Sequence, residues 1–424
     1  MHDCLSQDNR MNNLALNLRA RSWILSACFI FITLGRNVVE STFSLPISRR
    51  NFVDQASFIS STMALQGGYT SDVNSSGNFW NRETSREGEY SGKIVKEAKI
   101  ICLSDPADPD NERLYSDDLP QGSKVVAIGS SIDDFDILTL REQQPNVVFV
   151  SHPKVREVLV QLLDNLPSLE WVHTRSAGID FIASNGLASA NVLVTNAKGM
   201  YSSTLAEYTM MAISYFAKDL PRLMKQKEEK NWNKYPIEEI RGKTLGIVGY
   251  GDIGRAAAKL AKAYGMKVIA LRKKTKLSQF DPYCDEVFGG DKLNSLVERS
   301  DYVLVAAPLT PETKGLINAE VISHAKSSAV IINVGRGPII VEADLIEALE
   351  SSKIKGAALD VTEVEPCPKD SRLWTLDNVL LSPHNMDMTT TFMKESTDFF
   401  INENLPRYLR GIELLNPVDK AKGY

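Results

Sequence analysis

The run TLGIVGYGDIGRAAAKLAKAYGMKVIAL, residues 244–271 of the 424-residue chain, decides the fold. A short β-branched segment leads into the glycine pattern GYGDIG at 249–254, and apolar residues at helical spacing follow it. In such a unit the first glycine permits a tight turn, the second lets backbone approach a pyrophosphate, and the third allows helix and strand to pack closely. We therefore expect a dinucleotide-binding loop, with a glycine turn kept only for packing as the alternative. The residues expected to contact the cofactor are Gly249, Tyr250, Gly251, Asp252, Ile253 and Gly254.

The residues after the second strand of this unit indicate which dinucleotide is bound. A carboxylate about 20 residues beyond the glycine loop normally accepts hydrogen bonds from the adenosine ribose. Here the segment KVIAL runs instead into Arg272, Lys273 and Lys274. These cations suit a ribose 2′-phosphate, because guanidinium groups bind phosphate with paired hydrogen bonds. We expect NADP(H) to be favoured over NAD(H), unless the turn is only a solvated surface that tolerates either cofactor.

Outward from this unit, short β-branched runs alternate with helical stretches, which predicts an α/β fold with parallel sheets. The runs fall into two blocks, and each block indicates one doubly wound sheet. A helix expected at 202–217 is long enough to connect the blocks. Strands are expected at 100–103, 125–128, 147–150, 169–173 and 192–195 in the first block, and at 244–248, 267–271, 302–306, 330–334, 357–361 and 379–381 in the second.

The composition excludes several classes of protein. With 43% hydrophobic and 24% charged residues, the chain is typical of globular proteins and unlike collagens, coiled coils or multi-span membrane proteins. Its net charge of -5 gives no attraction toward nucleic acid or anionic lipid, so neither partner is expected. The five cysteines form no CxxC pair, and we therefore expect neither a metal site nor a disulfide framework.

Residues 1–92 differ from the rest, since they contain no lysine, and we expect them to be a targeting leader outside the fold. Residues 22–35 form an uncharged run of about 14 residues, shorter than the roughly 20 that span a bilayer, and resemble the apolar core of a signal peptide. The stretch 41–66 resembles a transit peptide, and its SRRNF resembles a twin-arginine signal. Delivery to a plastid is favoured. A mitochondrial presequence, a signal anchor or the secretory pathway is the alternative, and the mature chain is expected to have no stable membrane association.

Five segments outside the glycine loop add a family resemblance: RSAGIDFI (175–182), AAPLTPETKGLIN (306–318), INVGRGPII (332–340), ALDVTEVEP (358–366) and SPHN (382–385). With them, residues 93–424 resemble the D-isomer-specific 2-hydroxyacid dehydrogenase family, nearer its glyoxylate and hydroxypyruvate reductase members. The resemblance implies a flavodoxin-like substrate domain at 93–196, an inserted Rossmann NAD(P)-binding domain at 197–385 and a return to the substrate domain at 386–424. It also implies a homodimer and a small 2-oxo or D-2-hydroxy acid substrate.

The chemistry of such a reaction points to three residues. Reducing a 2-oxo acid needs a carboxylate anchor, a proton donor of near-neutral pKa and a hydride source within contact distance. Arg336, between two glycines, can fork to the substrate carboxylate and carbonyl oxygen, and it matches the family's substrate arginine. His384 matches the family's acid/base histidine, and Glu365 the carboxylate that holds the imidazole and raises its pKa. Singly, such an arginine can merely fix a turn and such a Glu-Pro pair can merely end an element.

The resemblance also assigns contacts around these three residues. The backbone N–H groups of Ala177 and Gly178 are expected to bind the substrate carboxylate together with Arg336. Asp360 is expected to face the nicotinamide carboxamide. His152, His173 and His324 have no place in the family pattern, and we expect them to be structural or surface residues. Further cofactor contacts are expected at Ala307, Pro308, Thr313, Val334 and His384.

One departure from the family and two other functions have to be weighed. The family usually has small residues after the histidine, whereas this chain has Asn385, Met386 and Asp387, which puts the shape of the substrate pocket in question. A non-catalytic, dinucleotide-sensing protein like the related corepressors is disfavoured by the intact Arg336, Glu365 and His384. A phosphoglycerate dehydrogenase-type enzyme is disfavoured by the missing ribose acid and by the expected absence of a C-terminal regulatory domain. A formate dehydrogenase would have glutamine in place of Glu365.

Overall fold

The computed structural model describes residues 94–115 and 119–420. The leader predicted at 1–92 therefore lies outside the described residues, and its targeting role stays a prediction. Among the residues described, none of the helices combines the length and the apolar character needed to cross a membrane.

The first sheet has five parallel strands in the order β2-β1-β3-β4-β5, which is the flavodoxin-like order. Its central strands read as continuous apolar runs, such as VVFV in β3, because both faces of a parallel sheet are covered. The strands are β1 (Ala98–Leu103), β2 (Ser123–Gly129), β3 (Val147–Val150), β4 (Trp171–Thr174) and β5 (Leu193–Asn196).

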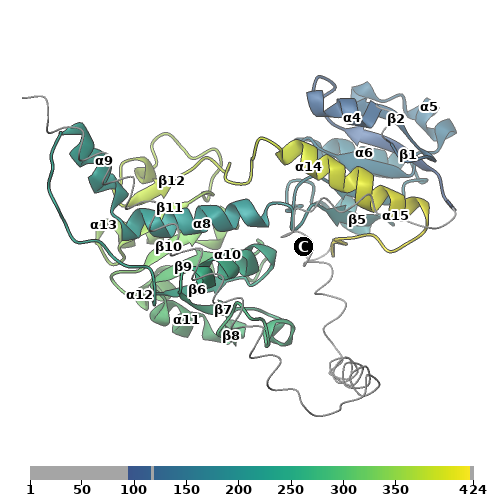
Figure 1. The fold of residues 1–424 in the computed structure, drawn as a ribbon. Coiled ribbons are helices and arrows are strands. Elements are labelled where there is room, and N and C mark those ends of the chain that lie inside the picture. The colour runs from purple at the N-terminus through teal and green to yellow at the C-terminus, as the bar shows by residue number, and fades with distance from the viewer. Residues whose placement is uncertain (1–93, 116–118, 421–424) are drawn as a thin grey trace, which may run out of the picture. The chain divides into compact units, whose positions relative to one another are not determined.

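Helices from both ends of the described chain cover this sheet (Figure 1). Those that follow the first strands are α4 (Glu112–Tyr115), α5 (Ile137–Gln143), α6 (Arg156–Asn165) and α7 (Asn185–Ser189). The last helical segment consists of α14 (Phe392–Phe399), a π-helical turn (Phe400–Asn404) and α15 (Leu405–Leu409). Its residues Phe400, Leu405 and Leu409 are buried in one cluster with Ile100 and Phe149 of the first sheet. The C-terminal segment therefore returns to the sheet with which the described chain begins.

The second sheet has seven parallel strands in the order β12-β11-β10-β9-β6-β7-β8, which extends the Rossmann order by one strand. Both β7 and β9 pair with β6, so the strand order reverses at β6 and the crevice for a dinucleotide lies at the carboxyl end of that strand. The predicted fold class, two doubly wound parallel sheets, is confirmed. The strands are β6 (Thr244–Val248), β7 (Lys267–Leu271), β8 (Glu286–Phe288), β9 (Tyr302–Val305), β10 (Val330–Asn333), β11 (Gly356–Leu359) and β12 (Val379–Leu381).

The long helix α8 (Ser202–Ala217) has the bounds expected from the sequence. Its buried side chains, among them Leu205 and Ile213, join one core with Ala257 and Ala261 of α10 (Asp252–Ala263). The remaining helices are α9 (Leu220–Glu228), α11 (Leu293–Arg299), α12 (Ala319–Ser323) and α13 (Glu342–Glu350). The short 3-10 turns are η1 (Pro109–Asn111), η2 (Ile132–Asp134), η3 (Thr275–Ser278), η4 (Gly290–Lys292), η5 (Gly337–Ile339) and η6 (Arg372–Trp374).

Candidate active site

The glycine loop between β6 and α10 has the geometry that a dinucleotide requires. Gly249 has a φ of +101°, and a Cβ there would lie 2.6 Å from the backbone nitrogen of Ala307. A Cβ at Gly254 would lie 2.5 Å from the carbonyl oxygen of Gly249. A Cβ at Gly251 would meet no atom within 4 Å. The outer two glycines are therefore needed for close packing, and the middle one leaves open backbone where a diphosphate can approach the N-terminus of α10.

The other residues of this loop have separate tasks. The side chain of Tyr250 is buried, with 1% of its surface exposed, so only its backbone can face a cofactor. Ile253 packs against the core beneath the sheet. The carboxylate of Asp252 lies 3.3 Å from the ammonium of Lys198. This lysine precedes α8 and carries no recognisable sequence signal.

The basic turn follows β7, at the same edge of the sheet as the glycine loop. Arg272 is half-exposed, and its guanidinium donates a hydrogen bond to the buried hydroxyl of Ser278. Lys273 is exposed, and its charge contributes to the lowered pKa of Glu312, after the larger effect of hydrogen bonds from Thr310 and backbone. The turn therefore presents a guanidinium oriented by Ser278 and an exposed ammonium beside it, and both groups can bind a phosphate.

The loops after β9 and β10 complete this edge. Ala307 is buried against Gly249. Thr313 closes its own loop, because its hydroxyl donates to the carbonyl oxygen of Pro308 at 2.7 Å and accepts from the amide of Thr310 at 2.8 Å. Val334, directly after β10, is buried. These four predicted residues thus shape the backbone around the glycine loop.

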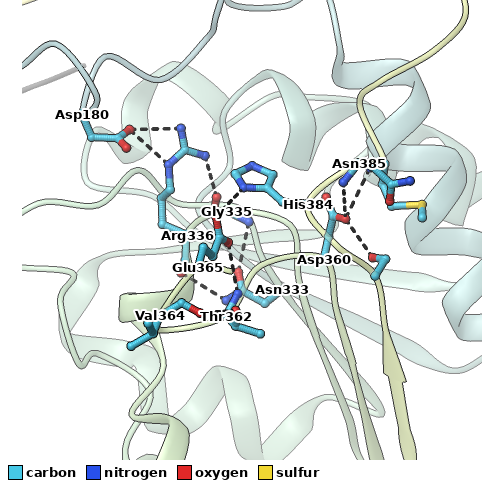
Figure 2. Close-up of polar contacts among 12 residues, drawn as sticks. Asp180, Asn333, Gly335, Arg336, Asp360, Thr362, Val364, Glu365, His384 and Asn385 are labelled. Carbon is cyan, nitrogen blue, oxygen red and sulfur yellow. Dashed lines mark hydrogen bonds and ion pairs between the residues drawn. The ribbon is translucent and has the colours of Figure 1, made fainter. Parts of the chain in front are cut away.

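His384 and Glu365 form a hydrogen-bonded pair (Figure 2). The Nδ1 atom of His384 lies 2.8 Å from Oε2 of Glu365, and the other carboxylate oxygen accepts from the amide of Thr362 at 3.2 Å. The backbone of His384 has a φ of +53° and donates to the carbonyl oxygen of Asp360 at 2.8 Å. A histidine in this rare conformation is a strained residue of the kind found at functional sites. Since Nδ1 faces Glu365, Nε2 is the ring nitrogen that can serve a substrate.

The two side chains shift each other's protonation. The hydrogen bond to Glu365 raises the pKa of His384 above its usual value, although burial and the charge of Arg336 act in the opposite direction. Burial alone would raise the pKa of Glu365, but the hydrogen bond and charge of His384 outweigh it and lower that pKa. The pair therefore favours an imidazolium beside a carboxylate, which is the state that a general acid needs near neutral pH.

Asp360 holds the loop that carries the histidine. Its side chain is 2% exposed, and its Oδ1 atom accepts hydrogen bonds from the hydroxyl of Ser382 at 2.8 Å and from the amides of Asn385 and Met386 at 3.1 and 3.3 Å. The family resemblance implies a contact of Asp360 with the nicotinamide carboxamide, and this contact stays a prediction. The structure adds a positioning task that sequence reasoning missed, together with Ser382.

Arg336 is fixed by three hydrogen bonds within the protein. Its Nε and Nη2 atoms both donate to Oδ1 of Asp180 at 3.1 Å, and Nη1 donates to the carbonyl oxygen of Gly335 at 2.9 Å (Figure 2). Asn333 supports the turn, since its amide nitrogen donates to the carbonyl oxygen of Arg336 at 3.1 Å. A Cβ at Gly178 would lie 1.8 Å from Nη2 of Arg336. The structure thus brings Gly178 and Arg336 together, two residues to which the family resemblance assigns the substrate carboxylate, and adds Asp180 and Asn333.

The loop that was expected to bind the substrate carboxylate is held through its carbonyl groups. The amide of Asn196 donates to the carbonyl oxygen of Ala177, and the hydroxyl of Tyr201 donates to that of Arg175, both at 2.5 Å. Within residues 94–115 and 119–420, no protein acceptor is bonded to the amides of Ala177 or Gly178. These two amides are therefore available to an anion, next to the guanidinium of Arg336.

The three other histidines that the structure describes lie apart from this constellation. His173 is buried and stacked on Phe400, and burial lowers its pKa to about 3. His152 accepts a hydrogen bond from the amide of Lys154, and His324 lies on the surface 3.6 Å from Glu320. In the described part of the chain, no three His, Cys, Asp or Glu side chains come together as metal ligands do.

Comparison with known proteins identifies the family. Residues 210–385 match the family model of the D-isomer specific 2-hydroxyacid dehydrogenase, NAD binding domain. The chain is 31% identical over 327 residues to the D-3-phosphoglycerate dehydrogenase of Methanocaldococcus jannaschii, a match that covers 73% of this chain but only 57% of that longer protein. It is 33% identical over 232 residues to the glyoxylate reductase of Thermofilum pendens, covering 53% of this chain and 67% of the relative.

A solved structure agrees with these sequence matches. The D-isomer specific 2-hydroxyacid dehydrogenase of Xanthobacter autotrophicus Py2, solved in complex with NADPH and MES, superposes with a TM-score of 0.64 at 29% identity. The superposition covers 77% of this chain and 100% of that one. The chain therefore belongs to the D-isomer specific 2-hydroxyacid dehydrogenases, a family of NAD(P)-dependent oxidoreductases that act on CH–OH groups.

Proposed function

We propose that this chain reduces a small 2-oxo acid, glyoxylate or hydroxypyruvate, with NADPH to the corresponding 2-hydroxy acid. The observation that carries the proposal is the hydrogen-bonded pair of His384 and Glu365 beside Arg336. All three follow strands of the second sheet, at the same edge as the glycine loop. The glyoxylate reductase of Thermofilum pendens supports this substrate class.

Each residue has a task that its geometry allows. Arg336 and the free amides of Ala177 and Gly178 bind the substrate carboxylate, and Arg336 also polarises the carbonyl group. The nicotinamide, when bound, supplies the hydride. His384 donates a proton from Nε2 to the oxygen on which negative charge develops, and Glu365 stabilises the imidazolium until that transfer. In the oxidative direction the neutral His384 accepts the proton instead.

The preference for NADP(H) over NAD(H) is part of the proposal. It is supported by Arg272, which is oriented by Ser278, and by Lys273 beside it, where a ribose-binding carboxylate would otherwise stand. The relative from Xanthobacter autotrophicus was solved with NADPH. Cations at this turn attract the 2′-phosphate and offer no acceptor to a ribose 2′-hydroxyl.

A phosphoglycerate dehydrogenase-type activity is the second candidate, because the Methanocaldococcus jannaschii protein has that name and 31% identity. The same site would then have to bind a phosphate on the substrate. Asp387, three residues after His384, is half-buried, and burial raises its pKa, so this residue offers a substrate phosphate no positive partner. A corepressor-like sensor would not need the paired His384 and Glu365.

A substrate screen tests the proposal. Purified chain is assayed with glyoxylate, hydroxypyruvate, 3-phosphohydroxypyruvate and a bulkier 2-oxo acid, each with NADPH and with NADH, and oxidation of the cofactor is followed at 340 nm. We expect kcat/KM to be highest for one of the first two acids with NADPH. Turnover of 3-phosphohydroxypyruvate above both would establish the second candidate, and absence of turnover with cofactor binding intact would support the sensor.

We also propose that residues 1–92 deliver the enzyme to a plastid. The support is their composition and the order of a signal-like segment before a transit-like one. A fusion of residues 1–92 to a fluorescent protein, expressed in an alga with complex plastids, is expected to label the plastid. Labelling of mitochondria or of the secretory pathway would contradict this destination.

A further inference from the structure

Asp180 is the residue at the site whose role neither the sequence nor the family assignment provides. It follows the substrate loop in the segment RSAGIDFI, and it is 156 positions from Arg336 in the chain. Its Oδ1 atom accepts from both Nε and Nη2 of Arg336 at 3.1 Å (Figure 2). The side chain of Asp180 is 54% exposed, and that of Arg336 is 28% exposed.

The hydrogen bonds of Arg336 within the protein leave some of its N–H donors for a substrate. A guanidinium has five N–H donors in a fixed plane. Three are engaged within the protein, two by Asp180 and one by the carbonyl oxygen of Gly335. Since Nη1 and Nη2 each carry two hydrogens, one donor remains on each. These two suit a fork to a substrate oxygen or carboxylate.

Close packing against Gly178 also restricts the guanidinium. Nη2 of Arg336 occupies the place where any side chain at position 178 would begin. It lies 1.8 Å from the Cβ that an alanine there would have. Asp180 therefore contacts Nε and Nη2 of one planar group, Gly335 contacts Nη1, and Gly178 lies against Nη2. Together they select one orientation of a long side chain that otherwise samples many rotamers.

The negative charge of Asp180 is explained by the orientation that it gives to Arg336, and neither by substrate attraction nor by folding. A carboxylate on the substrate-binding arginine weakens the attraction of that arginine for an anionic substrate. An exposed ion pair also contributes little to folding. A gain in orientation offsets the loss in attraction, because catalysis depends on donors that are already aligned where charge develops.

We propose that Asp180 is a positioning residue, which holds the guanidinium of Arg336 so that one N–H of each terminal nitrogen faces the substrate. The proposal rests on the proposed function, since it assigns Asp180 a task in binding the same 2-oxo acid. Asp180 acts through Arg336 and takes no part in proton transfer. An asparagine can replace it, because the amide oxygen accepts the same two hydrogen bonds.

The test compares Asp180→Ala with Asp180→Asn, and uses Asp164→Ala on the exposed face of α6 as the matched control. We expect Asp180→Ala to raise KM for the 2-oxo acid about three- to tenfold and to lower kcat, while the Kd of NADPH is unchanged. Asp180→Asn should recover most of kcat/KM, and Asp164→Ala should match the wild type. In an Arg336→Lys background, Asp180→Ala should have little further effect, because the fork that it orients is gone.

A binding measurement separates this proposal from the reaction itself. Oxamate, an unreactive analogue of small 2-oxo acids, is titrated calorimetrically into the chain saturated with NADPH. Weaker oxamate binding by Asp180→Ala, with recovery in Asp180→Asn, supports the positioning task even if no 2-oxo acid is turned over. The absence of turnover would contradict only the proposed function. A lower KM in Asp180→Ala would show that the carboxylate competes with substrate. Such a lower KM would overturn the proposal. So would unchanged kinetics and binding in both Asp180 variants, and so would a wild type that does not bind oxamate.

Discussion

His384 is the residue on which the proposed reaction depends most directly. Its Nδ1 atom is paired with Glu365 and its backbone is held by Asp360. The ring is therefore oriented from two sides, and its Nε2 atom can donate a proton.

Replacing this histidine tests the assignment of the general acid. General acid catalysis contributes on the order of 10²- to 10⁴-fold, so His384→Ala should lower kcat at least about 10²-fold. NADPH binding, measured by fluorescence titration, should remain, because the glycine loop is untouched. The surface variant His324→Ala is the control and should keep native turnover. A His384→Ala enzyme with near-native kcat would refute this role.

Glu365 gives a prediction about pH. The hydrogen bond and charge of Glu365 raise the pKa of His384. Reduction needs the protonated imidazole, so activity falls as the pH rises through this pKa. Glu365→Gln removes the negative charge and lowers the pKa, which should move the alkaline limb of the kcat/KM profile for reduction to lower pH. A limb that stays in place in Glu365→Gln, as is expected of the control Glu363→Gln, would leave Glu365 only a structural role.

At the scale of elements, the carboxyl ends of the second sheet collect nearly all the predicted site residues. Gly249 follows β6, Arg272 follows β7, Asp360 follows β11, and His384 lies three residues after β12. Parallel strands place these ends along one edge, with the change of strand order at β6 opening the crevice.

The turn after β7 gives the prediction about the cofactor. A charge-assisted hydrogen bond contributes roughly 1.5 to 3 kcal/mol, or about ten- to a hundredfold in affinity. Arg272→Asp should therefore weaken the binding of NADPH strongly and leave the binding of NADH unchanged or improved. The ratio of kcat/KM with NADPH to kcat/KM with NADH should then be reversed. Ser278→Ala removes the hydrogen-bond partner of the guanidinium and should give a smaller loss of affinity, for NADPH alone.

The control for the turn is Arg241→Asp, an exposed arginine before β6, at the opposite end of that strand. This variant should have the wild-type kcat/KM with both cofactors. If wild-type enzyme uses NADH as well as NADPH, or if Arg272→Asp still prefers NADPH, the basic turn is a solvated surface and the proposed preference is wrong.

At the scale of the whole molecule, four of the large apolar side chains that the described chain exposes lie in α9 or in the segment after it. Leu223 and Met224 are 46% and 62% exposed, and Trp232 and Ile237 are 95% and 57% exposed. A contiguous exposed apolar patch marks a surface that binds another protein, and these four residues are our candidates for such a patch. They lie within the cofactor domain, through which the family resemblance implies a homodimer.

Light scattering coupled to size-exclusion chromatography tests the homodimer. The purified chain should elute with twice the 47.0 kDa of one chain. Trp232→Asp combined with Met224→Asp should shift the mass toward the monomer, because each places a charge in an apolar interface. Leu138→Asp, at a position that is 72% exposed on α5, is the control and should leave the mass unchanged. A wild-type chain that is monomeric at all concentrations would contradict the prediction.

Local patterns in the sequence were sufficient for the two sheets and for much of the site. The predicted strands differ from the observed ones by two residues at most, because continuous apolar runs mark buried parallel strands. Only β8 (Glu286–Phe288) was missed in the second sheet. It is a three-residue edge strand that pairs with β7 alone and is partly exposed, so it has no apolar run to reveal it. The glycine loop and the three catalytic candidates could be found because each stands in a recognisable segment.

The tertiary structure alone decided which side chains hold those candidates. Asp180 meets Arg336 across 156 positions, and Asp360 binds the backbone of Asn385 and Met386 in the loop after another strand. Ser278 meets Arg272 only because η3 folds back beneath the turn. No local period or motif encodes these partners, since a hydrogen bond between loops depends on how the strands are ordered and how the loops fold over their ends. The sequence by itself determined which candidate residues stand at the edge of the sheet, and the tertiary structure determined how their side chains are oriented.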